Sequence, residues 1–121
     1  MKNITSKEKA RLIAKIAGEK KGEDIVLVDM TEQSAVCDWF VIVSAGSSRR
    51  IKTICDEVQK VLGKDKIFPI SVEGRSSLYW VLVDFEDVVM HVFSSEMRDF
   101  YGLERLWSDA PSERIEQHGR I

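Results

Sequence analysis

The sequence predicts a single α/β domain in which flanking helices cover a mixed five-stranded sheet. Two observations support this fold class. Segments with apolar periodicity come in the order helix, two strands, helix, three strands, helix, and no repeat, low-complexity run or linker divides them. A chain of 121 residues, 44% of them apolar, is also long enough for one packed core and too short for two. We expect the domain to span residues 1–110 and a polar tail, residues 111–121, to fray.

The first half of the chain predicts two helices and two strands. Thr5 stands three residues before Glu8, the spacing of a capping box, at the start of a helix with an apolar face. Two short β-branched segments, residues 24–30 and 38–45, are typical of strands. Ser47 or Ser48 caps a second helix, which we expect Gly63 to end. Its apolar residues recur at spacings of three and four: Ile51, Ile54, Cys55, Val58, Val61 and Leu62.

The second half predicts three strands and a broken helix. In "KIFPISVEG" (66–74), Pro69 cannot donate a ladder hydrogen bond, so this third strand lies at an edge or starts after the proline. The segments "LYWVLVDF" and "VVMHVF" are separated only by Glu86 and Asp87, which predicts a tight hairpin. The segment "SSEMRDFYGLERLW" (94–107) then predicts a helix interrupted near Gly102.

The hairpin fixes which side chains share a face. A two-residue loop sets Phe85 opposite Val88 and Trp80 opposite Phe93. One face is then apolar throughout and should pack on the helices: Tyr79, Val81, Val83, Phe85, Val88, Met90 and Val92. The opposite face mixes aromatic, aliphatic, imidazole and carboxylate groups: Trp80, Leu82, Asp84, Val89, His91 and Phe93.

This second face is our candidate binding surface, because aromatic burial dominates the cores of protein interfaces. The alternative is that a helix or the C-terminal segment of the same chain covers it, with His91 a half-buried structural residue. Residues at the C-terminal end either extend the surface or belong to the core: Leu103, Leu106 and Trp107. Carboxylates form its charged rim: Asp84, Asp87 and Glu104.

Charge and composition exclude several classes of function. The formal net charge is -2, which supplies no general positive field for a polyanion, so we expect the protein to bind protein more than RNA. No segment is typical of a signal peptide or a membrane span, and we expect a cytoplasmic location.

Cys37 and Cys55 fit a reducing compartment; Cys55 falls on an apolar helix face, whereas Cys37 could be exposed. With only His91 and His118 beside them, no zinc spacing exists, and we expect no metal and no cofactor.

A strand that turns through glycine into a helix, "VIVSAGSSRR" (41–50), is the usual geometry of a phosphate site. Nucleotidyltransferases follow such a Gly-Ser pair with two carboxylates at alternate strand positions, which hold magnesium. Here the carboxylates at that distance, Asp56 and Glu57, are adjacent on a helix and point in different directions. The serines at 44, 47 and 48 have no assignable base, so we predict no catalytic residue. Arg49 and Arg50 either contact an anion or form a solvated helix start.

Four segments in order resemble the Iojap-related ribosomal silencing factor family, RsfS: "DWFVIVSAGSSRR" (38–50), "VEG" (72–74) followed by Trp80, "VDFEDVVMHVF" (83–93) and "EMRDFYGLERLW" (96–107). The resemblance covers roughly residues 8–110. It implies a fold related to nucleotidyltransferases without their catalytic carboxylates, and a homodimer when free.

The resemblance also implies a function. Members of that family are understood to bind the large ribosomal subunit through its protein number fourteen and to prevent joining of the small subunit when nutrients are scarce, with ribosomal RNA a secondary contact. By position, Trp80 matches the tryptophan at that protein contact. The sequence departs from the family pattern at Glu86, where glycine is usual, and at Arg50, where glutamine or histidine is frequent.

Three hypotheses of function follow. The leading one is a non-enzymatic translational repressor that blocks subunit joining. The second is a nucleotide-binding or nucleotidyltransferase-like enzyme that uses the Gly46-Ser47 loop. The third is a dimeric scaffold for which the Trp80 face is only the contact between its own two copies.

Overall fold

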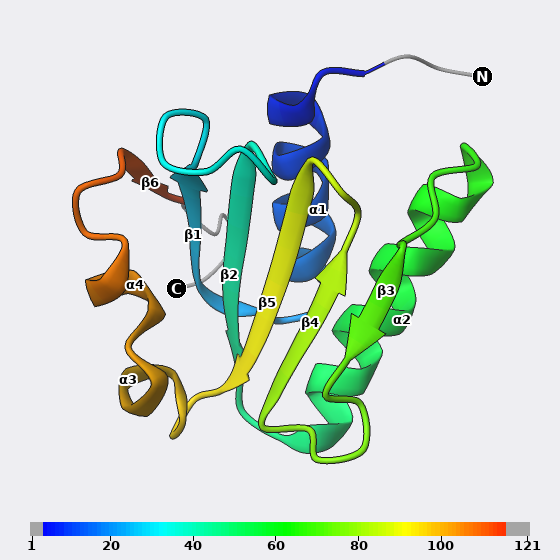
Figure 1. The fold of residues 1–121 in the computed structure, drawn as a ribbon. Helices are drawn as coiled ribbons and strands as arrows, with labels where there is room; N and C mark the ends of the chain where they lie inside the picture. The colour runs from blue at the N-terminus through cyan, green and yellow to red at the C-terminus, as the bar shows by residue number, and fades with distance from the viewer. Residues whose placement is uncertain (1–3, 116–121) are drawn as a thin grey trace.

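Two helices pack on one face of a six-stranded mixed sheet, and two one-turn helices lie against the other face (Figure 1). The computed structural model describes residues 4–115. The strand order across the sheet is β3-β4-β5-β2-β1-β6, with β2 and β5 parallel and the other neighbours antiparallel. The elements in chain order are α1 (Ser6–Glu19), β1 (Glu23–Asp29), β2 (Trp39–Ala45), α2 (Ser48–Lys64), β3 (Ser71–Glu73), β4 (Trp80–Asp84), β5 (Val88–Ser94), α3 (Arg98–Tyr101), α4 (Leu103–Leu106) and β6 (Ser112–Arg114).

The caps of the two long helices form as their sequences predict. The Thr5 hydroxyl accepts from the Glu8 N–H at 3.0 Å, and the Glu8 carboxylate accepts from the Thr5 N–H at 2.8 Å. At α2, Ser47 is the cap and accepts from the Arg50 N–H at 3.1 Å. The expectation that Gly63 ends α2 is wrong. The helix runs through Gly63 to Lys64, because a glycine tolerates helical backbone and this one makes room for the ring of Phe68.

The β4–β5 hairpin has the predicted register, with Trp80 opposite Phe93 and Asp84 opposite Val89. Phe85 donates to the Val88 carbonyl at 2.9 Å and closes the two-residue loop. Of the two loop residues only Glu86 has positive φ, +81°, and the Asp87 N–H bonds to the Phe85 carbonyl at 3.1 Å. The loop is therefore built around a γ-turn centred on Glu86 rather than a type I′ turn.

The expected helix-facing residues of the hairpin are buried against α1 and α2, with one exception. Tyr79 is 57% exposed, so its assignment to the core was wrong. It lies before the first residue of β4, directly after Leu78, whose left-handed backbone (φ +55°) turns the chain.

The edge position predicted for the strand after Pro69 is confirmed, since β3 pairs only with β4.

The predicted strand count was one too low. Residues of the predicted polar tail form β6, which pairs antiparallel with β1, and the Ile115 N–H adds a bond of 2.8 Å to the Ile25 carbonyl. Backbone pairing needs no apolar side chain, so the exposed, polar β6 gave no pattern to detect. The prediction that the tail frays is therefore wrong for residues 112–114. Residues 116–121 lie outside the described part of the chain. The domain boundary at residue 110 stays a prediction.

Each face of the sheet has its own apolar cluster. The larger lies between the sheet and α1 with α2; the smaller lies on the other face, where residues around α3 and α4 pack on it. Both cysteines are buried, Cys37 in the smaller cluster and Cys55 in the larger, and burial raises the pKa of the Cys55 thiol to about 12. Among residues 4–115, no helix has the length and apolar character needed to cross a membrane.

Candidate functional site

The six predicted site residues lie together on the sheet face opposite α1 and α2, but at two depths. On the central strand β5, Val89, His91 and Phe93 are buried, and Phe93 is 0% exposed. On β4, nearer the sheet edge, Trp80, Leu82 and Asp84 are half-buried. Only the β4 residues can touch a partner directly, while the β5 residues support them from below.

Trp80 is held by three aromatic neighbours. Its indole stacks on the Phe93 ring at 5.0 Å between centroids and meets the Tyr101 ring at 4.7 Å. The indole Nε1–H donates to His91 Nδ1 at 3.0 Å. These contacts fix the orientation of a large apolar side chain that remains partly exposed.

His91 acts as a hydrogen-bond acceptor for Trp80. It is 3% exposed, and burial lowers the pKa of its imidazole to about 4, so the ring is neutral at pH 7. The acceptor role of Nδ1 puts the remaining proton on Nε2, which has no hydrogen-bond partner among residues 4–115. The hydrogen bond that the structure shows at this imidazole positions the Trp80 indole.

Sequence reasoning missed two members of this surface. Phe40 of β2 meets the His91 ring edge-on at 4.6 Å and the Trp107 ring at 6.2 Å, while Tyr101 of α3 is 41% exposed beside Trp80. The signal for Phe40 was its alternation within residues 38–45, which becomes informative only once β2 is known to lie beside β5. We call the following half-exposed residues the Trp80 surface: Phe40, Trp80, Leu82, Tyr101, Leu103 and Trp107.

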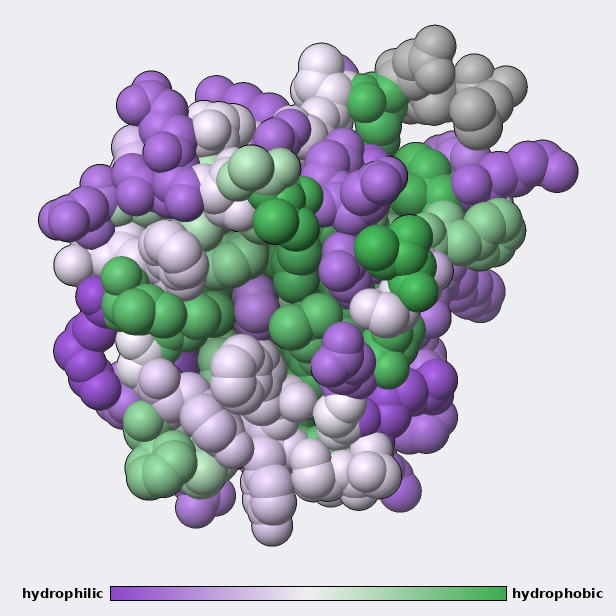
Figure 2. Space-filling model, viewed as in Figure 1, coloured by the Kyte–Doolittle hydropathy of each residue, from purple (hydrophilic) through white to green (hydrophobic). Residues whose placement is uncertain are grey.

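The open alternative, that the C-terminal segment covers this face, is partly correct. Leu103 and Trp107 pack on the smaller cluster, whereas Leu106 points to solvent. Coverage is incomplete: apolar side chains remain visible over β2, β5 and β4 in the middle of this face, bordered by hydrophilic ones (Figure 2). The face is therefore part core and part surface.

Arg98 anchors this cover to the sheet. The side chain is 7% exposed; its Nε donates to Glu104 at 2.7 Å, and its Nη1 donates to the Ser44 hydroxyl at 2.8 Å and to the Asp24 carbonyl at 2.5 Å. The hydrogen bond from Arg98 lowers the pKa of the Glu104 carboxyl. Gly102, with φ +63°, separates α3 from α4 and lets Glu104 reach back to Arg98.

The predicted carboxylate rim is largely neutralised within the chain. Asp87 pairs with Lys9 at 2.7 Å, and Glu104 pairs with Arg98. Asp84 has no ion-pair partner among residues 4–115, and its Oδ1 accepts from the Glu86 N–H at 2.7 Å. Of the three, Asp84 is the carboxylate without an ion pair among residues 4–115, and it stands on the same face as Trp80 at the other end of β4.

Side chains near the Gly46 loop have partners within the described residues. Asp56 lies on α2 and pairs with Lys52 at 2.8 Å and Arg75 at 3.6 Å. Ser47 caps α2, and Ser44 accepts from Arg98, so both hydroxyls have structural partners. Within the described residues, no three His, Cys, Asp or Glu side chains gather closely enough to hold a metal ion.

A family model described as "Ribosomal silencing factor during starvation" (RsfS) matches residues 3–120 of the chain. The chain belongs to the RsfS family. RsfS of Bacillus subtilis is 36% identical over 108 residues, which cover 89% of this chain and 92% of that protein. RsfS of Halalkalibacterium halodurans is 34% identical over 113 residues, which cover 93% and 97%.

Solved structures place the whole RsfS chain in one fold. A crystal structure of a Chromobacterium violaceum protein superimposes with a TM-score of 0.84 at 29% identity, covering 96% of this chain and 98% of that one. The α/β fold class and the resemblance in the four sequence segments are therefore confirmed. The RsfS match also continues beyond residue 110 to residue 120.

Proposed function

We propose that this RsfS-family protein represses translation by binding the large ribosomal subunit through its protein number fourteen and thereby blocking the small subunit. Family membership supports the coarser statement, a ribosome-associated silencing factor. The observation that carries the finer proposal is Trp80, a partly exposed tryptophan whose orientation three neighbours fix.

A preorganised tryptophan is well suited to bind protein. Tryptophan carries a large contact area on two side-chain torsions, and here stacking and the bond to His91 already restrict both. Leu82, Tyr101 and Leu103 extend the apolar area around it. Such a centre, ringed by polar groups, has the composition of an interface hot spot. Asp84 adds a charge that suits a basic ribosomal protein.

Obstruction requires size and affinity but no chemistry. A compact chain of 121 residues has a radius of gyration of about 14 Å. A body of that size on the joining surface would hold two subunits apart by far more than the few Å over which their contacts act. The proposal therefore assigns no catalytic step and no cofactor to the protein.

Three further statements belong to the same proposal. The free protein forms a homodimer, it acts in the cytoplasm, and any contact with ribosomal RNA is secondary to the protein contact. The competing scaffold hypothesis uses the Trp80 surface for the dimer alone. The two differ in what removal of Trp80 does: monomers with unchanged ribosome binding favour the scaffold, and loss of ribosome binding favours the repressor.

The direct test measures binding of purified large-subunit protein number fourteen by biolayer interferometry. Trp80→Ala should weaken binding by about 2–4 kcal/mol, roughly 30-fold to 1,000-fold, because it removes the centre of the surface. Trp80→Phe keeps the stacking and loses only the bond to His91, so it should bind with intermediate affinity.

Phe68→Ala is the matched control, since it removes an exposed aromatic ring outside the Trp80 surface and should bind as the wild type does. Near-ultraviolet circular dichroism establishes that each variant is folded. A folded Trp80→Ala that binds with wild-type affinity would refute the assigned site.

A further inference from the structure

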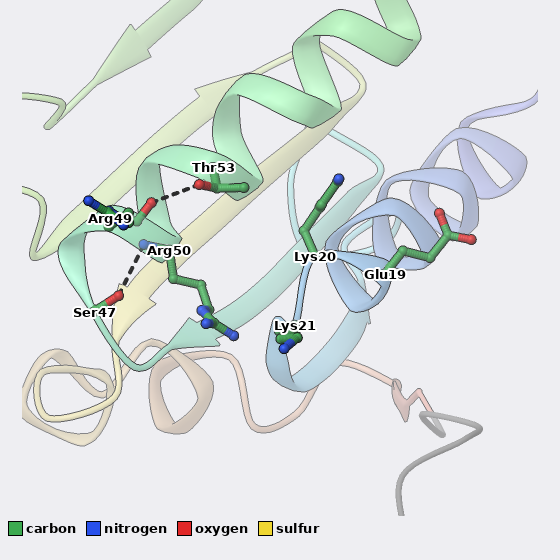
Figure 3. Close-up of a pocket in the computed structure, with 7 residues that line it drawn as sticks. All are labelled: Glu19, Lys20, Lys21, Ser47, Arg49, Arg50 and Thr53. Carbon is green, nitrogen blue, oxygen red and sulfur yellow. Dashed lines mark hydrogen bonds between the residues drawn. The ribbon is translucent and has the colours of Figure 1, made fainter.

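A basic hollow lies between the end of α1 and the start of α2, on the helix side of the sheet (Figure 3). Its volume is about 310 Å³. Four cationic side chains contribute to its wall, together with one carboxylate and two hydroxyls: Lys20, Lys21, Arg49, Arg50, Glu19, Ser47 and Thr53. The proposed repressor function uses none of these residues.

The structure shows no ion pair for the four cations within the part of the chain that it describes. Glu19 is the one carboxylate in the wall, and in Figure 3 it points away from Arg50. Four positive charges against one negative leave the hollow at +3, although the whole chain has a net charge of -2. The net charge of the whole chain therefore does not reveal this local concentration of positive charge.

The helix dipole favours Lys20 and Lys21 at the end of α1, but the fold does not account for two arginines at the start of α2 or for a residue other than glycine at position 21. Arg49 and Arg50 stand in the first turn of α2, where the helix dipole favours acidic side chains, and that turn contains none. Lys21 has a φ of +68° and directly follows the cap residue of α1. Its N–H donates to the Gly18 carbonyl, and the N–H of Gly22 donates to the Ala17 carbonyl. Glycine is the usual residue at that position of a helix end. An anion in the hollow would pair with cations that the ion pairs among residues 4–115 leave unused.

The geometry suits a phosphate group. In Figure 3 the Arg50 side chain extends toward Lys21, with Arg49 and Lys20 farther out. First-turn N–H groups of a helix such as α2 lack helical acceptors and strengthen anion binding. The volume lies at the low end of the range for small-ligand sites, about 300–1,000 Å³. Gly46, next to the cap, leaves open space beside the backbone.

We propose that the basic hollow binds the phosphate of a nucleotide, either free or within an RNA strand. Arg50 and Lys21 contact the phosphate oxygens, and Arg49 and Lys20 add the surrounding field. The site binds and does not catalyse, because the described residues around it include no carboxylate pair for a metal ion. The site lies across the sheet from the Trp80 surface and does not depend on the proposed function.

The test uses the full chain without ribosomes and two probes, a short fluorescein-labelled oligouridylate and fluorescein-labelled GTP, followed by fluorescence anisotropy. Arg50→Glu should weaken binding by about tenfold or more, because a charge-assisted contact is lost and a repulsive one is created. Lys60→Glu makes the same change on an exposed part of α2 outside the hollow and should bind within about twofold of wild type, as salt screens distant charges.

Lys21→Gly provides a second readout. It removes one cation from the hollow and relieves the positive φ, so the free protein should melt at a higher temperature while it binds the probe more weakly. Arg50→Glu should likewise not lower the melting temperature, since glutamate suits the start of α2. If Lys21 and Arg50 served only the fold, both substitutions would lower the melting temperature.

Binding of either probe with these losses supports the proposal, and the probe that binds identifies the source of the phosphate. No binding of either probe, or equal loss in Arg50→Glu and Lys60→Glu, would overturn it. Trp80→Ala should bind the probes as the wild type does, so failure of this proposal is distinct from failure of the proposed function.

Discussion

The pairing of Trp80 with His91 shows how one buried polar group can fix the orientation of a partly exposed tryptophan. His91 takes the Trp80 Nε1–H as its hydrogen-bond donor, and Phe93 stacks beneath the same indole. A charged imidazole could not accept that bond at Nδ1. The low pKa that burial gives His91 therefore keeps the Trp80 surface in its ordered form near neutral pH.

This pairing predicts a dependence of stability on pH. The pKa of His91 falls from 6.5 in the unfolded chain to about 4 in the folded one, so between these values the unfolded state binds more protons and stability decreases as the pH falls. The loss amounts to about 3 kcal/mol when complete. Urea unfolding across this range should show it, whereas His91→Gln, which keeps an acceptor but does not titrate, should flatten the curve.

Asp29 and Glu104 have carboxyl pKa values that hydrogen bonds lower, so they contribute only below about pH 4.5. If the wild type is equally stable at pH 6.5 and at about pH 4, the conclusion that His91 is buried as a neutral imidazole is refuted.

Glu86 is strained where the hairpin turns. Its φ of +81° is a conformation that glycine adopts freely and glutamate does not. Glu86→Gly should raise the free energy of unfolding by about 1 kcal/mol, measured by urea unfolding. Asp87→Gly tests the neighbouring position, where no positive φ exists and the bond to Lys9 is lost, and it should destabilise the protein. A destabilised Glu86→Gly would contradict this reading of the turn.

At the scale of elements, the cover formed by α3 and α4 depends on few attachments. Both helices have only one turn, so their stability comes from packing on the smaller cluster and from Arg98. Because Tyr101 belongs to this cover and contacts Trp80, the attachment of the cover also determines the shape of the Trp80 surface.

Arg98→Ala should therefore loosen the cover. We expect a loss of about 2 kcal/mol, because the bonds to Glu104, Ser44 and the Asp24 carbonyl disappear together. Hydrogen exchange of the amides in residues 98–107 should accelerate. Arg105→Ala removes an exposed arginine that bonds only to the Asp99 carbonyl, and should change little. Unchanged exchange in Arg98→Ala would show that packing alone holds the cover.

The elements also show what a sequence can predict. The hairpin register followed from a two-residue loop and a period of two, both local properties, and every predicted pair from Trp80 to Asp84 formed. The strand β6 was missed because its three residues are polar and exposed and pair through the backbone alone. Phe40 and Tyr101 were missed because they reach His91 and Trp80 through long-range packing, and the alternation around Phe40 does not tell which strand lies beside β2.

At the scale of the whole molecule, the two faces of the sheet differ in chemistry. The face opposite α1 and α2 carries the Trp80 surface, and the helix side carries the basic hollow. The net charge of the chain does not reveal this division, because negative charges elsewhere outweigh the charge of +3 at the hollow and give a total of -2. A protein divided in this way can present one face to a protein and the other to a phosphate.

The central claim is that the protein obstructs subunit joining through the Trp80 surface, and co-sedimentation tests it most directly. Purified wild type is mixed with isolated large subunits, small subunits are added, and the gradient is compared with that of a folded Trp80→Ala. We predict that the wild type travels with the large subunit and reduces joined ribosomes, while Trp80→Ala does neither. A wild type that stays at the top of the gradient, or that binds while joining proceeds unchanged, would contradict the account.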